Sequence, residues 1–136
     1  MTFEFVDTNI LLYAHEKEAS EKQRVSSKLL ERLIEKGGGA VSTQVLMEFY
    51  STGTRKLKLS SQEGEDVIES LRHWKTHSPN HASLLEAIRL QRRHKLSWFD
   101  ALIVTSALAL ECSILWTEDL QHNQHFGSLT IKNPFR

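Results

Sequence analysis

Residues 3–16 read FEFVDTNILLYAHE, and this stretch predicts the first strand, the first helix and the point where one passes into the other. Residues 3–6, three of which are apolar, predict a short buried strand, and residues 9–15 predict the start of a helix. Asp7 is the only charged residue between positions 5 and 14. Because an isolated carboxylate is costly to bury, Asp7 must be solvated at the end of an element, paired with a cation, or engaged in holding a metal ion.

The rest of the chain continues the alternation of short strands and helices. Gly37–Gly39 end one helix, and Ser60 and Glu63 have the spacing of a capping box at the start of another. We expect further helices at Ser20–Lys36, from Thr43 as the cap to Leu57, from Ser60 onward, from Asn80 to Lys95 and at Leu96–Leu110. We expect further strands at Ala40–Ser42, within His73–His77, at Ser113–Trp116 and at Leu129–Lys132. This alternation indicates an α/β sandwich around a parallel sheet.

Composition places the chain among ordinary globular proteins and excludes several classes. Its 136 residues, 40% of them hydrophobic, predict one domain over residues 1–136. Lys plus Arg and Asp plus Glu both count 17, so any nucleic-acid surface must be a local patch. Cys112 is the only cysteine, which excludes an internal disulfide and is typical of a reducing cytoplasm. No apolar run reaches the ~18–20 residues of a membrane span, and there is no signal-peptide pattern, so we expect a cytoplasmic protein without a membrane partner.

Five carboxylates lie in or beside the most apolar parts of the chain: Asp7, Glu48, Asp100, Glu118 and Asp119. Each has a plain structural explanation. Asp7 suits a helix cap, Asp100 complements the positive end of its helix, Glu48 lies at the margin of an amphipathic stripe, and the Glu118–Asp119 pair suits a turn. Asp7 and the last pair also follow predicted strands, at the sheet edge where α/β proteins place their ligands.

Taken together, these acids favour a metal site. Converging carboxylates without buried cations repel one another, and a hard divalent cation such as Mg²⁺ relieves that repulsion with oxygen ligands. One or two such ions activate water and neutralise the charge that develops on a phosphodiester. The chemistry that this pattern favours is metal-dependent phosphodiester hydrolysis.

Four motifs carry a family resemblance: VDTNILLYA, TQVLMEFY, SWFDALIVTSA and ILWTEDLQ, in this order. The set resembles the PIN-domain ribonucleases, and more narrowly the VapC-type toxins of bacterial type II toxin–antitoxin modules. The resemblance covers essentially the whole chain. It implies a three-layer α/β/α sandwich with a central, mostly parallel sheet.

The resemblance also implies an activity and a set of site residues. The activity is Mg²⁺- or Mn²⁺-dependent cleavage of single-stranded RNA that leaves a 5′-phosphate and a 3′-hydroxyl, in a protein that dimerises and is inhibited by a cognate antitoxin. Asp7, Glu48 and Asp100 match the family's metal-site acids, and either Glu118 or Asp119 matches a fourth. In the family, certain polar residues support the site or its waters, and the matching positions here are Thr8, Asn9 and Thr117. One departure is the segment HNQHFGSLT, which offers no acid after Asp119.

Basic and aromatic residues near these acids suggest substrate contacts. Two pairs, Arg55–Lys56 and Arg92–Arg93, lie close in sequence to Glu48 and Asp100 and could position phosphates, although solvated helix ends are the favoured interpretation. Trp98 and Phe99 could stack on a base, but core packing is the favoured interpretation.

Two other functions remain open at this stage. The first is a catalytically silent PIN-like module that binds RNA or a protein through the same groove. The second is a phosphatase with Asp7 as nucleophile, which is disfavoured because Asn9 stands where the usual Asp-x-Asp pattern has its second acid. The spacing of His122 and His125 does not favour zinc, because no cysteine pair accompanies them.

Overall fold

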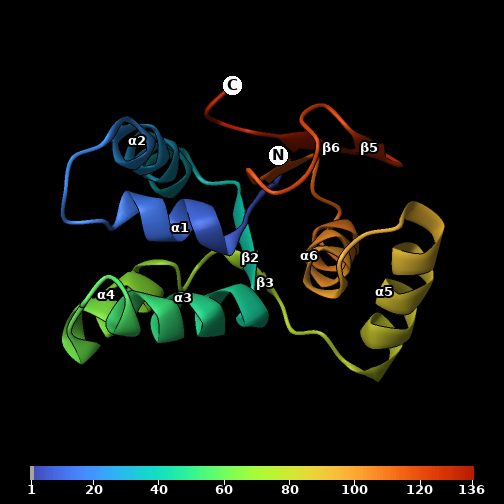
Figure 1. The fold of residues 1–136 in the computed structure, drawn as a ribbon, viewed down its shortest axis with the longest axis horizontal. Helices are drawn as coiled ribbons and strands as arrows, with labels where there is room; N and C mark the ends of the chain where they lie inside the picture. The colour runs from blue at the N-terminus through green and yellow to red at the C-terminus, as the bar shows by residue number, and fades with distance from the viewer. Residues whose placement is uncertain (1) are drawn as a thin grey trace.

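A six-stranded sheet with helices on both sides organises residues 2–136, the part of the chain that the computed structural model describes (Figure 1). The strands are β1 (Glu4–Val6), β2 (Gly39–Ser42), β3 (Lys75–His77), β4 (Ile114–Trp116), β5 (His125–Phe126) and β6 (Leu129–Lys132). The helices are α1 (Thr8–Ala14), α2 (Glu21–Lys36), α3 (Thr43–Arg55), α4 (Ser61–Ser70), α5 (His81–His94) and α6 (Trp98–Ala109).

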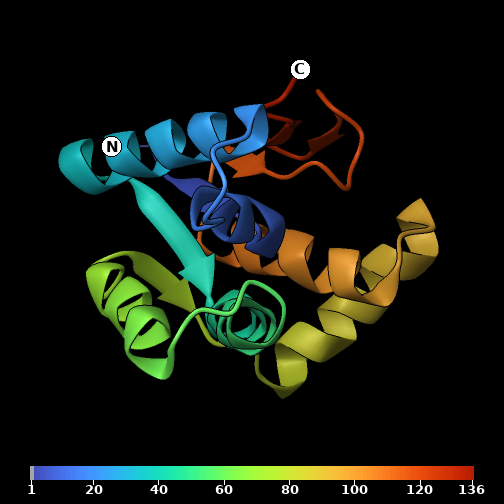
Figure 2. The same cartoon turned by 60° about the vertical axis from the view of Figure 1, so that its left-hand side comes forward.

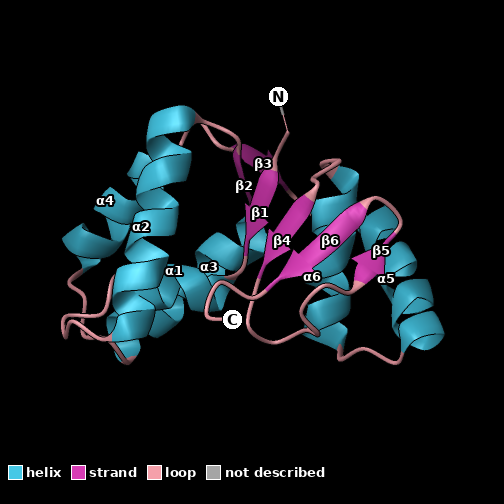
Figure 3. Ribbon diagram, turned by 90° about the horizontal axis from the view of Figure 1, so that it is seen from above, coloured by secondary structure: helices cyan, strands magenta, loops and turns pink. Residues whose placement is uncertain are grey.

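The sheet is mostly parallel, with strand order β3-β2-β1-β4-β6-β5 and only β5 antiparallel to its neighbour. Helices α1 to α4 lie on one side of it, and α5 and α6 lie on the other (Figure 3). Helix α1 packs between α2 and α3 (Figure 2). The predicted α/β/α arrangement with a central, mostly parallel sheet is therefore confirmed.

The position of β1 in the middle of the sheet determines where a ligand can bind. After β1 the chain moves outward to β2 and β3, and it then returns through α5 and α6 to place β4 on the other side of β1. Because β1 and β4 are parallel neighbours, with Val6 paired to Trp116, their carboxyl ends meet at the same edge. Such a switch in strand order opens a crevice at that edge in α/β folds.

The core consists of the apolar side chains of the central strands and the helices that cover them. Phe5, Val6 and Leu115 in β1 and β4 have no exposed surface, and neither do Val104 and Ala107 in α6. Fully burying one large aliphatic or aromatic side chain contributes roughly 1.5–3 kcal/mol. The strands β1 and β4 are thus held rigidly, and the loops that follow them start from fixed points.

The structure differs from the sequence-based expectation at two local points. Helix α3 is capped by Ser42, whose hydroxyl accepts from the Val45 N–H at 3.2 Å, and not by Thr43. The short strand β5 was not expected; it pairs with β6 through a tight turn at Gly127, whose φ of 60° favours glycine.

Two further observations concern Cys112 and the possibility of a membrane crossing. Cys112 is buried, and burial raises the pKa of its thiol to about 11, so it is an unreactive core side chain. No helix within residues 2–136 combines the length and hydropathy that a membrane crossing requires.

Gly39→Ala is expected to destabilise the fold by about 1–3 kcal/mol. Gly39 lies in β2, where an added Cβ would come closer than 3.0 Å to the indole ring of Trp74. Urea unfolding of Gly39→Ala with and without Trp74→Ala measures the effect. The cost of the glycine change should fall sharply once the indole is removed, and an equal cost in both backgrounds would show that the ring is not the cause.

Candidate functional site

A pocket of about 310 Å³ lies at the edge of the sheet where β1 and β4 end. Its walls come from the loops after these strands and from α1, α3 and α6. The lining residues are Asp7, Thr8, Asn9, Leu12, Gln44, Glu48, Thr52, Phe99, Asp100, Ile103 and Asp119. Four of the five carboxylates singled out in the sequence therefore line one pocket.

Asp7 is the most deeply buried of these acids, with 6% of its surface exposed. It is the N-cap of α1, and its carboxylate accepts hydrogen bonds from the Thr8 N–H at 2.7 Å and from the Thr117 hydroxyl at 2.8 Å. Burial, reinforced by the charges of Asp119 and Asp100, raises the pKa of Asp7 to about 7 despite these two donors. The helix cap and the pocket acid are thus the same residue, so the two explanations do not exclude one another.

Glu48 projects into the pocket from the second turn of α3. Its two carboxylate oxygens accept from the Thr8 hydroxyl at 3.1 Å and from the Gln44 side-chain amide at 3.0 Å. The sequence pattern alone did not lead us to predict Gln44 as a residue of the site. The available signal was its spacing, because residues 44, 48 and 52 lie four apart on one helix face, and all three line the pocket.

Asp119 reaches the pocket from the loop after β4, and neighbouring polar groups fix that loop. The Asn9 side-chain amide donates to the Asp119 carboxylate at 2.9 Å, and the Asp119 N–H donates to the Thr117 hydroxyl oxygen at 3.1 Å. Thr117 is fully buried and also holds Asp7. One hydroxyl therefore connects the loops that follow β1 and β4.

Asp100 enters from the first turn of α6, which Ser97 caps. Partial burial, together with the charge of Asp119, raises the pKa of the Asp100 carboxyl above its usual value. The charge of Asp119 raises the pKa of both Asp7 and Asp100, and the charge of Asp100 also raises that of Asp7, so these carboxylates lie in one acidic environment.

Glu118 lies outside this pocket, although it is the neighbour of Asp119 in the chain. It forms an ion pair with Lys22 at 2.9 Å and accepts a short hydrogen bond from the Tyr13 hydroxyl. These hydrogen bonds and the charge of Lys22 lower the pKa of Glu118 against the opposing effect of burial. Of the two acids that the sequence left as alternatives, the geometry brings Asp119 to the site and directs Glu118 away from it.

The pocket is acidic and has no cationic side chain among the described residues that line it. The four ion pairs found within residues 2–136 all involve other acids. Two neutral acceptors at the pocket, the side-chain carbonyl oxygens of Asn9 and Gln44, are buried with no donor in the described chain. Carboxylate and amide oxygens are the ligands of hard divalent cations, so the donor set fits Mg²⁺ or Mn²⁺.

The carboxylates line the walls of the pocket and do not converge on one point. Within the described part of the chain, no three Asp, Glu, His or Cys side chains are already close enough to hold an ion directly. Mg²⁺ commonly keeps several of its waters, so this arrangement suits an ion bound partly through water.

The basic residues predicted to contact substrate lie away from the acids. Arg55, Lys56, Arg92 and Arg93 are exposed, and none of them lines the pocket. Arg55 lies seven residues beyond Glu48, a distance of about 10 Å along a helix. Their contact with RNA stays a prediction that concerns the surface around the pocket.

The two aromatic residues before Asp100 differ in their surroundings. Trp98 is partly buried and packs with Leu96 against a small cluster that includes Ala101 and Leu102. Phe99 is 62% exposed and lines the acidic pocket. The expectation of core packing is therefore wrong for Phe99.

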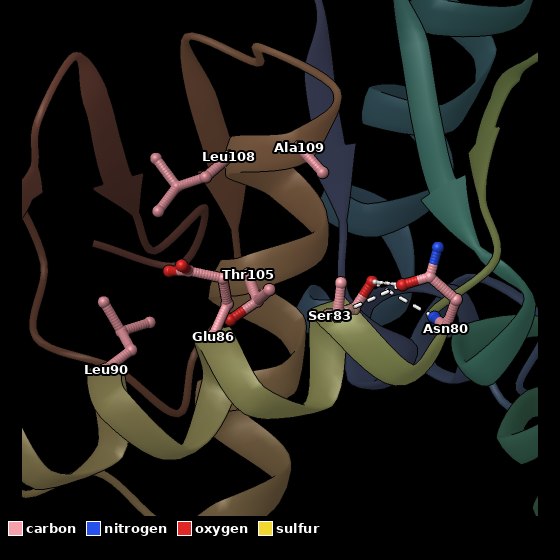
Figure 4. Close-up of a pocket in the computed structure, with 8 residues that line it drawn as sticks. Asn80, Ser83, Glu86, Leu90, Thr105, Leu108 and Ala109 are labelled. Atoms are coloured by element: carbon pink, nitrogen blue, oxygen red, sulfur yellow. Dashed lines mark hydrogen bonds between the residues drawn. The ribbon is translucent and has the colours of Figure 1, made fainter.

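A second pocket of about 370 Å³ lies between α5 and α6 and has a different character (Figure 4). Figure 4 shows Asn80 and Ser83 at one end of this pocket, joined by the hydrogen bonds that cap α5. Leu90 lies at the other end of the pocket. Its one acid, Glu86, is paired with Arg89 at 3.0 Å. This pocket has no group of acids, so the acidic pocket is the stronger candidate for chemistry.

Comparison with known families agrees with this geometry. Residues 5–125 match the family model of the PIN domain. The chain belongs to the PIN-domain family. A sequence comparison with curated proteins finds no match.

Solved structures share the fold of this PIN domain at low sequence identity. A toxin–antitoxin complex from Klebsiella pneumoniae is similar with a TM-score of 0.71 and 18% identity, over 96% of this chain and 97% of that chain. VapBC2 from Rickettsia felis, bound to a DNA fragment from their promoter, is similar with a TM-score of 0.67 and 21% sequence identity. This match covers 97% of this chain and 98% of that chain. The sarcin–ricin-loop-cleaving toxin VapC20 from Mycobacterium tuberculosis is similar with a TM-score of 0.61 and 14% sequence identity. This match covers 82% of this chain and 86% of that chain.

Asp7→Asn is expected to stabilise this PIN domain in EDTA above pH 7. The folded-state pKa of Asp7 is about 7, whereas an unfolded Asp titrates near ~3.9. Between these values the folded state binds the proton more tightly, so the parent loses stability as pH rises through this window. Asn removes that loss and still caps a helix well, so the expected gain is on the order of 1–4 kcal/mol, reached above about pH 7.

Urea unfolding of both proteins at about pH 4 and above pH 7 measures this difference. The advantage of Asp7→Asn should be small at the lower pH and full at the higher one. Asp66→Asn, which changes an exposed acid on α4, is the matched control and should change stability by less than about 0.5 kcal/mol. A destabilised Asp7→Asn protein, or a pH-independent difference, would contradict the account of Asp7.

Proposed function

We propose that this PIN domain is a Mg²⁺-dependent endoribonuclease that cleaves single-stranded RNA, and that it is the toxin of a toxin–antitoxin pair. The observation that carries the proposal is the acidic pocket. Asp7, Glu48, Asp100 and Asp119 come from four separate segments to one crevice that no Lys or Arg of the described chain neutralises. Mutually repelling acids at a ligand crevice are expected where a cation and an anionic substrate meet.

The residues of the pocket have distinct parts in the proposed reaction. Asp7, Asp100 and Asp119 would hold the divalent cation with Glu48, and a cation bound there supplies the Lewis acidity that ionises a water and neutralises phosphate charge. Thr117 fixes the Asp7 carboxylate and the Asp119 loop, and Asn9 orients the Asp119 carboxylate. These donors hold the acids in place before substrate binds, as preorganised sites require.

Glu48 has its own support on the opposite wall. The Thr8 hydroxyl and the Gln44 amide each donate to one of its oxygens. Both carboxylate oxygens are thus oriented, while the Gln44 carbonyl oxygen is left without a donor.

The structural neighbours support the biological part of the proposal. Two of them are a toxin–antitoxin complex and VapBC2, and the third is a toxin that cleaves the sarcin–ricin loop. By analogy, the partner of this chain is a cognate antitoxin and its substrate is RNA. A homodimer is a further expectation from the family resemblance.

Asp100→Asn is expected to lower RNA cleavage by at least about 100-fold, because loss of even an outer-shell partner typically costs ~10–100-fold in metal sites. The assay mixes purified protein with a panel of single-stranded RNAs in Mg²⁺ and follows the 5′-phosphorylated products. EDTA should abolish cleavage by the parent, and Mn²⁺ should restore it.

Asp66→Asn serves again as the control, since it removes an acid far from the pocket lining. It should cleave like the parent. Equal cleavage by Asp100→Asn and the parent would refute the site assignment. A parent that binds RNA but cleaves nothing in either metal would instead support the catalytically silent binding module.

A further inference from the structure

Phe99 is the feature of the acidic pocket that the proposed chemistry leaves unexplained. It occupies the first turn of α6, directly before Asp100, and 62% of its surface is exposed. Six of the other eleven residues of α6 are buried. An exposed aromatic ring at a pocket indicates a binding role more often than a scattered surface residue does.

The geometry of α6 directs the ring toward the pocket. Successive residues of an α-helix point about 100° apart, so Trp98 packs against the Ala101–Leu102 cluster while Phe99 faces elsewhere. Ile103 lies four residues beyond Phe99, on the same helix face, and it also lines the pocket. The pocket therefore has an apolar wall of Leu12, Phe99 and Ile103 beside its acids.

Phe99 and Asp100 are adjacent in the chain and both line this pocket. A group stacked on Phe99 and a group held at Asp100 can therefore belong to the same or to adjacent nucleotides. The phosphate of a nucleotide would bind at the cation held by the acids, whereas its neutral, planar base would stack on the ring of Phe99.

We propose that Phe99 stacks on an unpaired nucleobase next to the phosphate that the acidic pocket binds. This inference rests on the proposed function and adds a base-binding subsite to it. Aromatic rings bind bases of any sequence through their π faces. A base inside a duplex is already stacked on both sides, so the subsite selects single-stranded RNA at that position.

The surroundings of Phe99 favour a base over a protein partner. Protein interfaces have a contiguous apolar centre, and the other exposed large hydrophobic residues lie apart from this pocket. Met47 and Tyr50 line a separate groove with Leu46 and Ile68, and that groove shares no residue with the acidic pocket. Phe99 is the only aromatic ring among the described residues that line the acidic pocket, and polar side chains make up most of the rest of that lining.

The test measures RNA binding in the Asp100→Asn background, which is expected to hold RNA uncut. The probes are a fluorescently labelled short oligoadenylate and a ribose-phosphate oligomer of equal length without bases, both in Mg²⁺. Phe99→Ala should weaken oligoadenylate binding roughly 5- to 150-fold. It should leave binding of the abasic oligomer unchanged, since that ligand has nothing to stack.

Conservative variants separate stacking from apolar packing. Phe99→Tyr keeps the ring and should bind oligoadenylate like the parent, whereas Phe99→Leu keeps apolar volume without a π face and should resemble Phe99→Ala. Met47→Ala, at a residue 65% exposed outside the pocket, is the matched control and should have no effect. Thermal unfolding verifies that every variant is folded.

Three outcomes would overturn the proposal: unchanged oligoadenylate binding in Phe99→Ala, full binding in Phe99→Leu, or an equal loss for the abasic oligomer. Loss of binding to a partner protein in Phe99→Ala, with RNA binding intact, would also overturn it and assign the ring to a protein interface. These binding results are distinct from failure of the proposed function, which shows as absence of metal-dependent cleavage by the parent.

Discussion

The burial of the Asp7 carboxylate without a cationic side chain is the constraint on which the site depends. β1 must end in the core for the sheet to form around it, and the residue at that end is an acid with 6% of its surface exposed. Two hydrogen bonds and a helix N-terminus stabilise the charged form, yet burial and two further acids still raise its pKa to about 7. A fold that keeps such a group loses stability, and the divalent cation that we propose would offset this loss.

The topology of the sheet explains why the other acids reach Asp7. β4 lies beside β1, so Thr117 and Asp119 follow a strand that ends at the same edge. α3 begins directly after β2, the other neighbour of β1, and α6 begins at this edge, where its first turn brings Asp100 to the pocket. Four segments far apart in sequence therefore meet in one pocket. The Thr117 hydroxyl links two of these segments, because it donates to the Asp7 carboxylate and accepts from the Asp119 N–H.

The sequence predicted the layered fold and the meeting of the acids because both depend on strand ends and helix faces, which follow regular periods. It could not separate Glu118 from Asp119, because adjacent loop residues have no period that tells which one points inward. Phe99 was misjudged for a related reason: α6 is apolar on nearly every side, so the pattern does not mark the face that borders the pocket. The two-residue strand β5 is too short to show alternation.

We propose that a divalent cation occupies the pocket among Asp7, Asp100 and Asp119. The most direct test is a crystal of the protein grown with Mn²⁺ and measured for anomalous scattering. We predict an anomalous peak inside the acidic pocket, within coordination distance of the Asp7 carboxylate or of waters bound to it, and no peak there in Asp7→Asn crystals. A well-ordered pocket without a peak, or Mn²⁺ bound only at other sites, would contradict the account.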